Sequence, residues 1–83
     1  MEKFELFNSY YKTIVVYDPA TQLLYIKIGV NNKVYSYPEV TQAMFKNIIQ
    51  FNDEKKAIGS TIIYLNNKGS FGKEVPEDSI DWS

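Results

Sequence analysis

The chain has 83 residues, a length that predicts one small domain, which we place at residues 1–73 and follow with an acidic tail at residues 74–83. Cysteine is absent, so no disulfide framework supports the fold, and aromatic residues make up 16% of the chain, enough to supply a small core with buried area. The net charge is −1 and all nine basic residues are lysine, which argues against a long nucleic-acid backbone as the main ligand.

The first half of the chain predicts strands. Residues 4–11 are aromatic-rich without a clean period, so a strand, a short helix and a docking arm all stay open there. Residues 12–18 predict a strand that ends at Asp18-Pro19, and residues 23–29 predict a second one after a turn. In the second strand, alternation points Leu24, Ile26 and Ile28 inward and leaves Tyr25 and Lys27 on the opposite face.

A third strand is predicted at residues 33–37, after a turn at Asn31-Asn32. Val34 and Ser36 share one of its faces. Tyr35 and Tyr37 share the other, and Pro38 stops the ladder because it has no N–H to donate.

The second half predicts one helix and one strand. Apolar residues recur at helical spacing over residues 39–52, and Pro38 suits the position before a first turn. Residues 60–65, STIIYL, predict a fourth strand after a polar loop. The expected fold is therefore an α+β domain in the order β-β-β-α-β, with a curled antiparallel sheet packed on one helix.

Two patterns in this region also fit a known family. The first is Tyr35-Ser36-Tyr37, and the second is the helical spacing of Val40, Phe45 and Ile48. Together with Val16-Tyr17-Asp18, Leu24 and Ile26, these patterns give a resemblance to the KTSC domain family over residues 9–51. Members of this family are short domains found alone in bacterial and phage proteins and at the C-terminus of some lysyl-tRNA synthetases. After the first helix the family has a short second helix, whereas this sequence predicts a loop and a strand. The resemblance implies no established activity, and the link to the synthetases suggests RNA binding.

The composition also limits the chemistry. Histidine and cysteine are both absent, which removes the usual general base near neutral pH, the common zinc sites and the Ser-His and Cys-His nucleophiles. The acidic residues outside the tail lie on predicted turns and helix ends, so no paired-carboxylate site is expected. We therefore predict no catalytic residue, no metal site and no cofactor.

Two groups of residues are candidates for ligand binding. Tyr35 and Tyr37 either form an aromatic platform beside Tyr25, with Lys27 and Lys33 at its edge, or lie beneath the helix or in a subunit interface, because the register cannot be read from the sequence. The loop NNKGSFGKE could hold an anion through Lys68, Ser70 and Lys73 and the amides near its glycines. Its alternative role is a plain connection to the tail.

From these features we expect a non-catalytic binding module for a nucleobase-containing ligand. The ligand would be a short RNA or a small nucleotide, such as a host-defence signal that a phage protein sequesters. The alternative is a protein-interaction module that uses exposed aromatics and the acidic tail with Trp82. We further expect a homo-oligomer, because a small core gains stability by assembly. A cytoplasmic location is expected, because no charged-then-apolar leader and no long apolar run occur.

Overall fold

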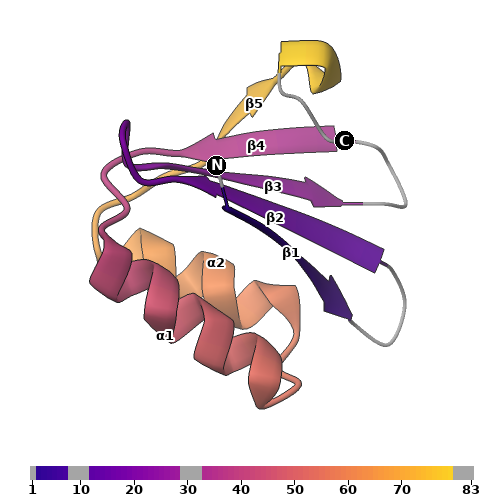
Figure 1. Ribbon diagram of the computed structural model, residues 1–83, viewed down its shortest axis with the longest axis vertical. Coiled ribbons are helices and arrows are strands. Elements are labelled where there is room, and N and C mark those ends of the chain that lie inside the picture. The colour runs from indigo at the N-terminus through magenta and orange to yellow at the C-terminus, as the bar shows by residue number, and fades with distance from the viewer. Residues whose placement is uncertain (1, 8–11, 29–32, 80–83) are drawn as a thin grey trace.

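The computed structural model describes residues 2–7, 12–28 and 33–79. Its sheet has five antiparallel strands in chain order: β1 (Glu2–Phe7), β2 (Lys12–Asp18), β3 (Leu23–Ile28), β4 (Lys33–Tyr37) and β5 (Lys73–Val75). Two helices, α1 (Gln42–Asp53) and α2 (Ile58–Asn67), cover one face of the sheet, and a short 3-10 helix, η1 (Glu77–Ser79), follows β5 (Figure 1). The α+β class and the antiparallel sheet are confirmed. No helix in the described part of the chain is long and apolar enough to cross a membrane.

The core lies between the helices and the face of the sheet that they cover. Strands β2, β3 and β4 contribute alternate side chains to it, and the inward face predicted for residues 24, 26 and 28 is confirmed. The stacked rings of Tyr17 and Phe45, with centroids 4.5 Å apart, join β2 to α1. The buried cluster comprises Val15, Tyr17, Leu24, Ile26, Tyr37, Val40, Phe45, Ile48, Ile58 and Leu65.

Helix α1 begins three residues later than the sequence predicts. Thr41 is its N-cap, and the Thr41 Oγ1 accepts a hydrogen bond from the Met44 N–H at 3.2 Å. The preceding residues are held out of the helix, because Glu39 has a φ of 59° and the Val40 N–H donates to the Gln22 carbonyl at 2.8 Å. The predicted start at residue 39 is therefore wrong.

The strand predicted at residues 60–65 is also wrong, because these residues belong to α2. Their β-branched side chains favour a strand locally. The buried residues of this segment are nevertheless Ile58, Thr61 and Leu65, which are spaced for one face of a helix. Packing against the sheet and α1 decides the structure here, and the edge-to-face rings of Phe51 and Tyr64, 5.3 Å apart, join the two helices.

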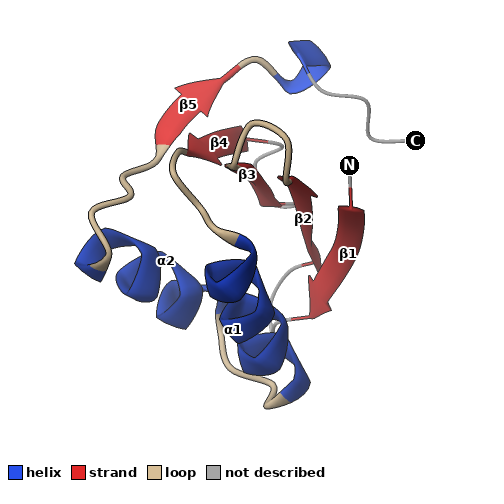
Figure 2. Cartoon of the chain, turned by 60° about the vertical axis from the view of Figure 1, so that its left-hand side comes forward, coloured by secondary structure: helices blue, strands red, loops and turns tan. Residues whose placement is uncertain are grey.

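The predicted curled sheet on one helix is replaced by an open sheet beneath two helices, in which β1 to β4 form an antiparallel meander and β5 is added beside β4 after the helices (Figure 2). Of residues 4–11, for which a strand, a short helix and a docking arm were left open, residues 4–7 belong to β1 and pair with β2, and residues 8–11 lie outside the described residues. Strand β5 was not predicted, and its three residues pair with β4 across the boundary that the sequence suggested at residue 74. The turn expected at Asn31-Asn32 lies outside the described residues.

Candidate functional site

The register of the sheet separates the three tyrosines of the predicted platform. Tyr35 pairs with Ile26 and Tyr37 pairs with Leu24, so both tyrosines lie on the face covered by the helices. Tyr37 is only 5% exposed. Tyr25 pairs with Ser36 and lies on the opposite face, which we call the outer face. Of the alternatives left open, the one realised places Tyr35 and Tyr37 against the core.

Burial also affects the chemistry of Tyr37. It raises the pKa of the Tyr37 hydroxyl above its usual value, because the charged form loses contact with water, and the neighbouring Tyr35 adds to the rise. The hydroxyl is therefore neutral at physiological pH and behaves as part of the core.

The loop after α2, which the sequence offered as an anion site, is built around a helix cap. Gly69 has a φ of 85°, its N–H donates to the Asn66 carbonyl, and the Ser70 N–H donates to the Leu65 carbonyl at 2.9 Å. These are the two bonds of a Schellman motif. The Ser70 hydroxyl is buried and donates to the Pro38 carbonyl at 2.7 Å. Ser70 thus fastens the loop to the end of β4.

The next residues of the loop pack directly on Tyr37. A Cβ atom added at Gly72 would lie 2.6 Å from the Tyr37 Cζ, so only glycine allows this contact. Ser70 and Gly72 both face inward, and Phe71 between them is 65% exposed. The loop therefore presents one phenyl ring to solvent between two fixed points. Phe71 is not among the site residues that the sequence predicts, although an aromatic residue between a serine and a glycine is a signal for an exposed ring in a loop.

Phe71 adjoins a row of side chains that crosses the outer face. Tyr25 on β3 pairs with Ser36 on β4, and Ser36 pairs with Lys73 on β5. Lys73 is exposed, whereas Tyr25 and Ser36 are half-buried. Because Gly72 faces inward, Phe71 and Lys73 lie on the same side of the chain. We call Tyr25, Ser36, Phe71 and Lys73 the outer-edge surface.

A second row of the outer face is closed by the chain itself. Lys27, Val34 and Val75 are register partners on β3, β4 and β5. The Lys27 Nζ forms an ion pair with the Glu77 Oε1 at 2.6 Å, and Val34, which lies between Lys27 and Val75 in this row, is 1% exposed. Lys27 and the start of the acidic tail are thus occupied with each other.

The remaining predicted site residues lie apart from this surface. Lys33 is exposed at the start of β4, and its register partner is Ile28. Lys68 is the C-cap of α2, and its Nζ lies 5.7 Å from the centre of the Tyr64 ring. Trp82 lies outside the described residues. Of the eight predicted site residues, the structure places Tyr25 and Lys73 together with Ser36 and Phe71, which were not predicted.

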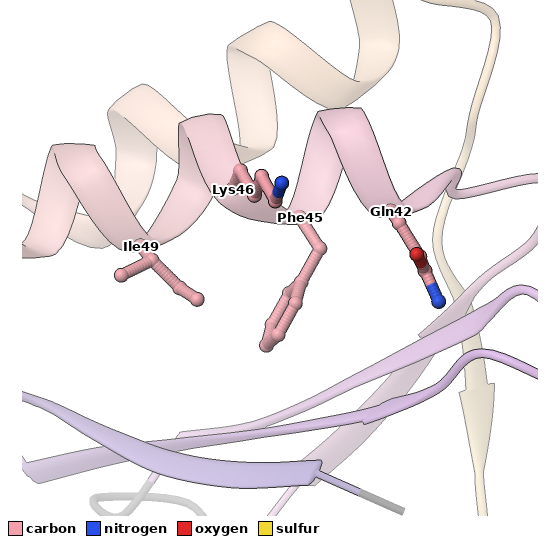
Figure 3. Close-up of a pocket in the computed structure, with 4 residues that line it drawn as sticks. All are labelled: Gln42, Phe45, Lys46 and Ile49. Carbon is pink, nitrogen blue, oxygen red and sulfur yellow. The ribbon is translucent and has the colours of Figure 1, made fainter.

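A shallow groove lies on the other side of the molecule, against α1. It has a volume of about 220 Å³ and is lined by Gln42, Phe45, Lys46 and Ile49. Figure 3 shows Phe45 and Ile49 directed from α1 toward the strands, with β1 the nearest strand and α2 behind α1. No ion pair of Lys46 occurs within the described residues. The groove thus has an apolar floor and a polar rim.

The described residues contain no group of three or more His, Cys, Asp or Glu side chains that could hold a metal ion. The outer-edge surface offers an aromatic ring, a hydroxyl and an ammonium group, which suit stacking, hydrogen bonding and attraction of an anion.

Comparison with protein-family models, with curated proteins and with solved structures gave no match.

Proposed function

We propose that this chain is a non-catalytic binding module for a nucleobase-containing ligand, a nucleotide or a short single-stranded RNA, and that the outer-edge surface receives it. The observation that carries the proposal is the exposed ring of Phe71 held between two anchored residues. Because the residues on both sides of Phe71 are anchored, a flat partner that stacks on the ring has to fix little more than the side chain itself. Aromatic side chains stack on nucleobases of any sequence.

The polar groups of the surface fit the rest of such a ligand. Lys73 is exposed beside Phe71 and offers an ammonium group to a phosphate. Ser36 and Tyr25 offer hydroxyls one and two strands away in the same row. Because few lysines take part, counterion release is small, which favours a small nucleotide over a long RNA.

Binding without turnover would withdraw a nucleotide from solution. If the ligand is a signalling nucleotide of host defence, this chain sequesters the signal, which is the role that we propose for a phage protein of this size.

The proposal is tested by isothermal titration calorimetry with ribonucleoside monophosphates, cyclic dinucleotides and short single-stranded RNAs. Phe71→Ala should weaken binding by about 1–3 kcal/mol for each base stacked, which is roughly 5- to 150-fold. Ile63→Ala is the matched control, because Ile63 is 63% exposed but lies on α2. Equal losses in both variants, or no binding by any of these nucleotides, would refute the proposal.

Salt distinguishes the two forms of ligand. For a short RNA that contacts Lys68 and Lys73, the logarithm of the affinity should fall with that of the salt concentration with a slope of about −1.4. A small nucleotide carries no condensed counterion atmosphere, so its affinity should change little with salt concentration.

The second candidate function is a protein-interaction module. It is favoured by Ile63, whose large side chain is 63% exposed in the middle of α2, in addition to Phe71. Exposed apolar and aromatic side chains of this kind anchor protein interfaces. Under this reading the nucleotides do not bind, and Ile63→Ala and Phe71→Ala both weaken capture of the protein partner. Removal of residues 80–83 then tests whether the tail with Trp82 contributes.

A further inference from the structure

Among the described strands, β1 is an edge strand with a partner on one side only. It lies at the end of the strand order and pairs with β2 alone (Figure 1). It is six residues long, whereas the opposite edge strand, β5, has three. No other strand in the described part of the chain pairs with the free side of β1. A long free edge presents N–H and C=O groups in the spacing that another strand requires.

We propose that β1 binds β1 of a second copy of this chain, in antiparallel pairing about a twofold axis perpendicular to the sheet. Side chains alternate between the two faces of a strand, and directly opposed residues share a face. The twofold axis must therefore pass between a residue of one copy and the same residue of the other copy. In the strand EKFELF, the axes that pair most of the strand pass through Lys3, Phe4 or Glu5.

Charge selects one of these three registers. An axis through Lys3 opposes two lysines, and an axis through Glu5 opposes two glutamates, and like charges directly opposite each other are destabilising. An axis through Phe4 places Lys3 of each copy opposite Glu5 of the other. This register forms two Lys3–Glu5 pairs between the copies. The same charges would repel each other in the other two registers, so they favour this one.

The groove along α1 supports the same partner. It lies between α1 and the sheet on the β1 side, away from α2 (Figure 3). Strand pairing about the twofold axis keeps the helices of both copies on one face and brings the two grooves toward each other. The exposed apolar side chain of Ile49 and the exposed edge of Phe45 would then be buried between the two copies. The sheet edge thus fixes the register, and the grooves add apolar area.

The first test is the molecular mass of the chain across a concentration series, measured by sedimentation velocity. The wild type should form a dimer. Lys3→Glu and Glu5→Lys should each weaken the dimer by roughly tenfold or more, because each turns two attractive pairs into two repulsive ones. The double variant Lys3→Glu/Glu5→Lys should restore the dimer. A monomer at every concentration, or a dimer that is insensitive to both single substitutions, would overturn the proposal.

The second test maps the register by cross-linking, which is clean because the native chain has no cysteine. A mixture of Lys3→Cys and Glu5→Cys chains should form disulfide-linked heterodimers, since opposed residues bring their Cβ atoms within about 5.5 Å. Either variant alone should cross-link poorly, because its two cysteines then lie two residues out of register. Efficient linkage of the Glu5→Cys chain to itself would show another register and refute this one. Circular dichroism of each variant confirms that the monomer is folded.

Discussion

The contact between Gly72 and Tyr37 should make Gly72→Ala one of the most damaging small substitutions in the chain. The added Cβ would lie 2.6 Å from the Tyr37 Cζ and 2.8 Å from its hydroxyl oxygen. Both distances are well below a normal carbon contact of about 3.5–4.0 Å. The ring is 5% exposed and belongs to the core cluster, so it has no free space to move into.

Overpacking of this kind destabilises a core by about 1–3 kcal/mol. For a domain of this size, a loss of 1 kcal/mol lowers the melting temperature by roughly 4–8 °C. We therefore expect Gly72→Ala to melt roughly 5–20 °C below the wild type. Circular dichroism during thermal and urea unfolding measures the change.

Two controls assign the loss to this contact. Gly59→Ala places a Cβ in open space within α2, so it should leave stability unchanged or raise it by up to about 1 kcal/mol. Tyr37→Leu removes the ring atoms that the new Cβ would meet, so Gly72→Ala should cost much less in that background. A Gly72→Ala protein as stable as the wild type, or an equal cost in both backgrounds, would refute the reasoning.

Three further predictions concern stability. Lys55 follows the C-cap of α1 and has a φ of 60°, a conformation that favours glycine. Lys55→Gly should therefore stabilise the domain by about 0.5–1 kcal/mol, measured by urea unfolding. Gly69 holds the equivalent position of α2, so Gly69→Ala should destabilise the domain by about 1 kcal/mol. The same sign for both changes would contradict the helix-cap account. Thr13 is fully buried, and its Oγ1 has no hydrogen-bond partner among the described residues. Thr13→Val should therefore raise the free energy of unfolding by about 1 kcal/mol. A clear loss of stability in this variant would show that the hydroxyl is hydrogen-bonded. The raised pKa of Tyr37 means that its contribution to stability is complete below the unfolded value of about 10 and is lost as the pH rises through the folded value. Melting temperatures between pH 8 and 11 should therefore fall less steeply in Tyr37→Phe, and an unchanged profile would exclude Tyr37 as the cause.

Local sequence patterns were sufficient for the strands of the hairpin region. The predicted strand at residues 12–18 coincides with β2 and that at 33–37 coincides with β4, because alternation and a following proline leave few alternatives. The same patterns failed at α2, where β-branched residues are packed as a helix. They also missed β5, since a three-residue strand carries too few positions for a period.

The candidate site was less predictable because its parts depend on distant contacts. Whether Tyr35 and Tyr37 face the helices is decided by how β4 aligns with β3 and by where α1 and α2 pack. The exposure of Phe71 depends on Ser70 reaching Pro38, 32 residues earlier in the chain. No local pattern reveals a contact over that distance, so the sequence offers Ser70 only as a candidate anion ligand or as part of a plain connection, whereas its hydroxyl holds the loop to Pro38.

The two proposed surfaces lie at opposite edges of the sheet, which has a consequence for binding. Pairing through β1 would join two five-stranded sheets into one of ten strands and leave the outer-edge surface of each copy near β5, at the far ends. A ligand at one end then makes no contact with the dimer interface and has no different affinity for monomer and dimer, so it cannot shift the equilibrium between them. Titration of a dimer should give two equal, independent sites, and saturating nucleotide should leave the dimer dissociation constant unchanged. Cooperative binding, or a dimer that forms only with ligand, would show that the ligand contacts β1 or α1 and would move the binding site from Phe71 to the groove beside Phe45.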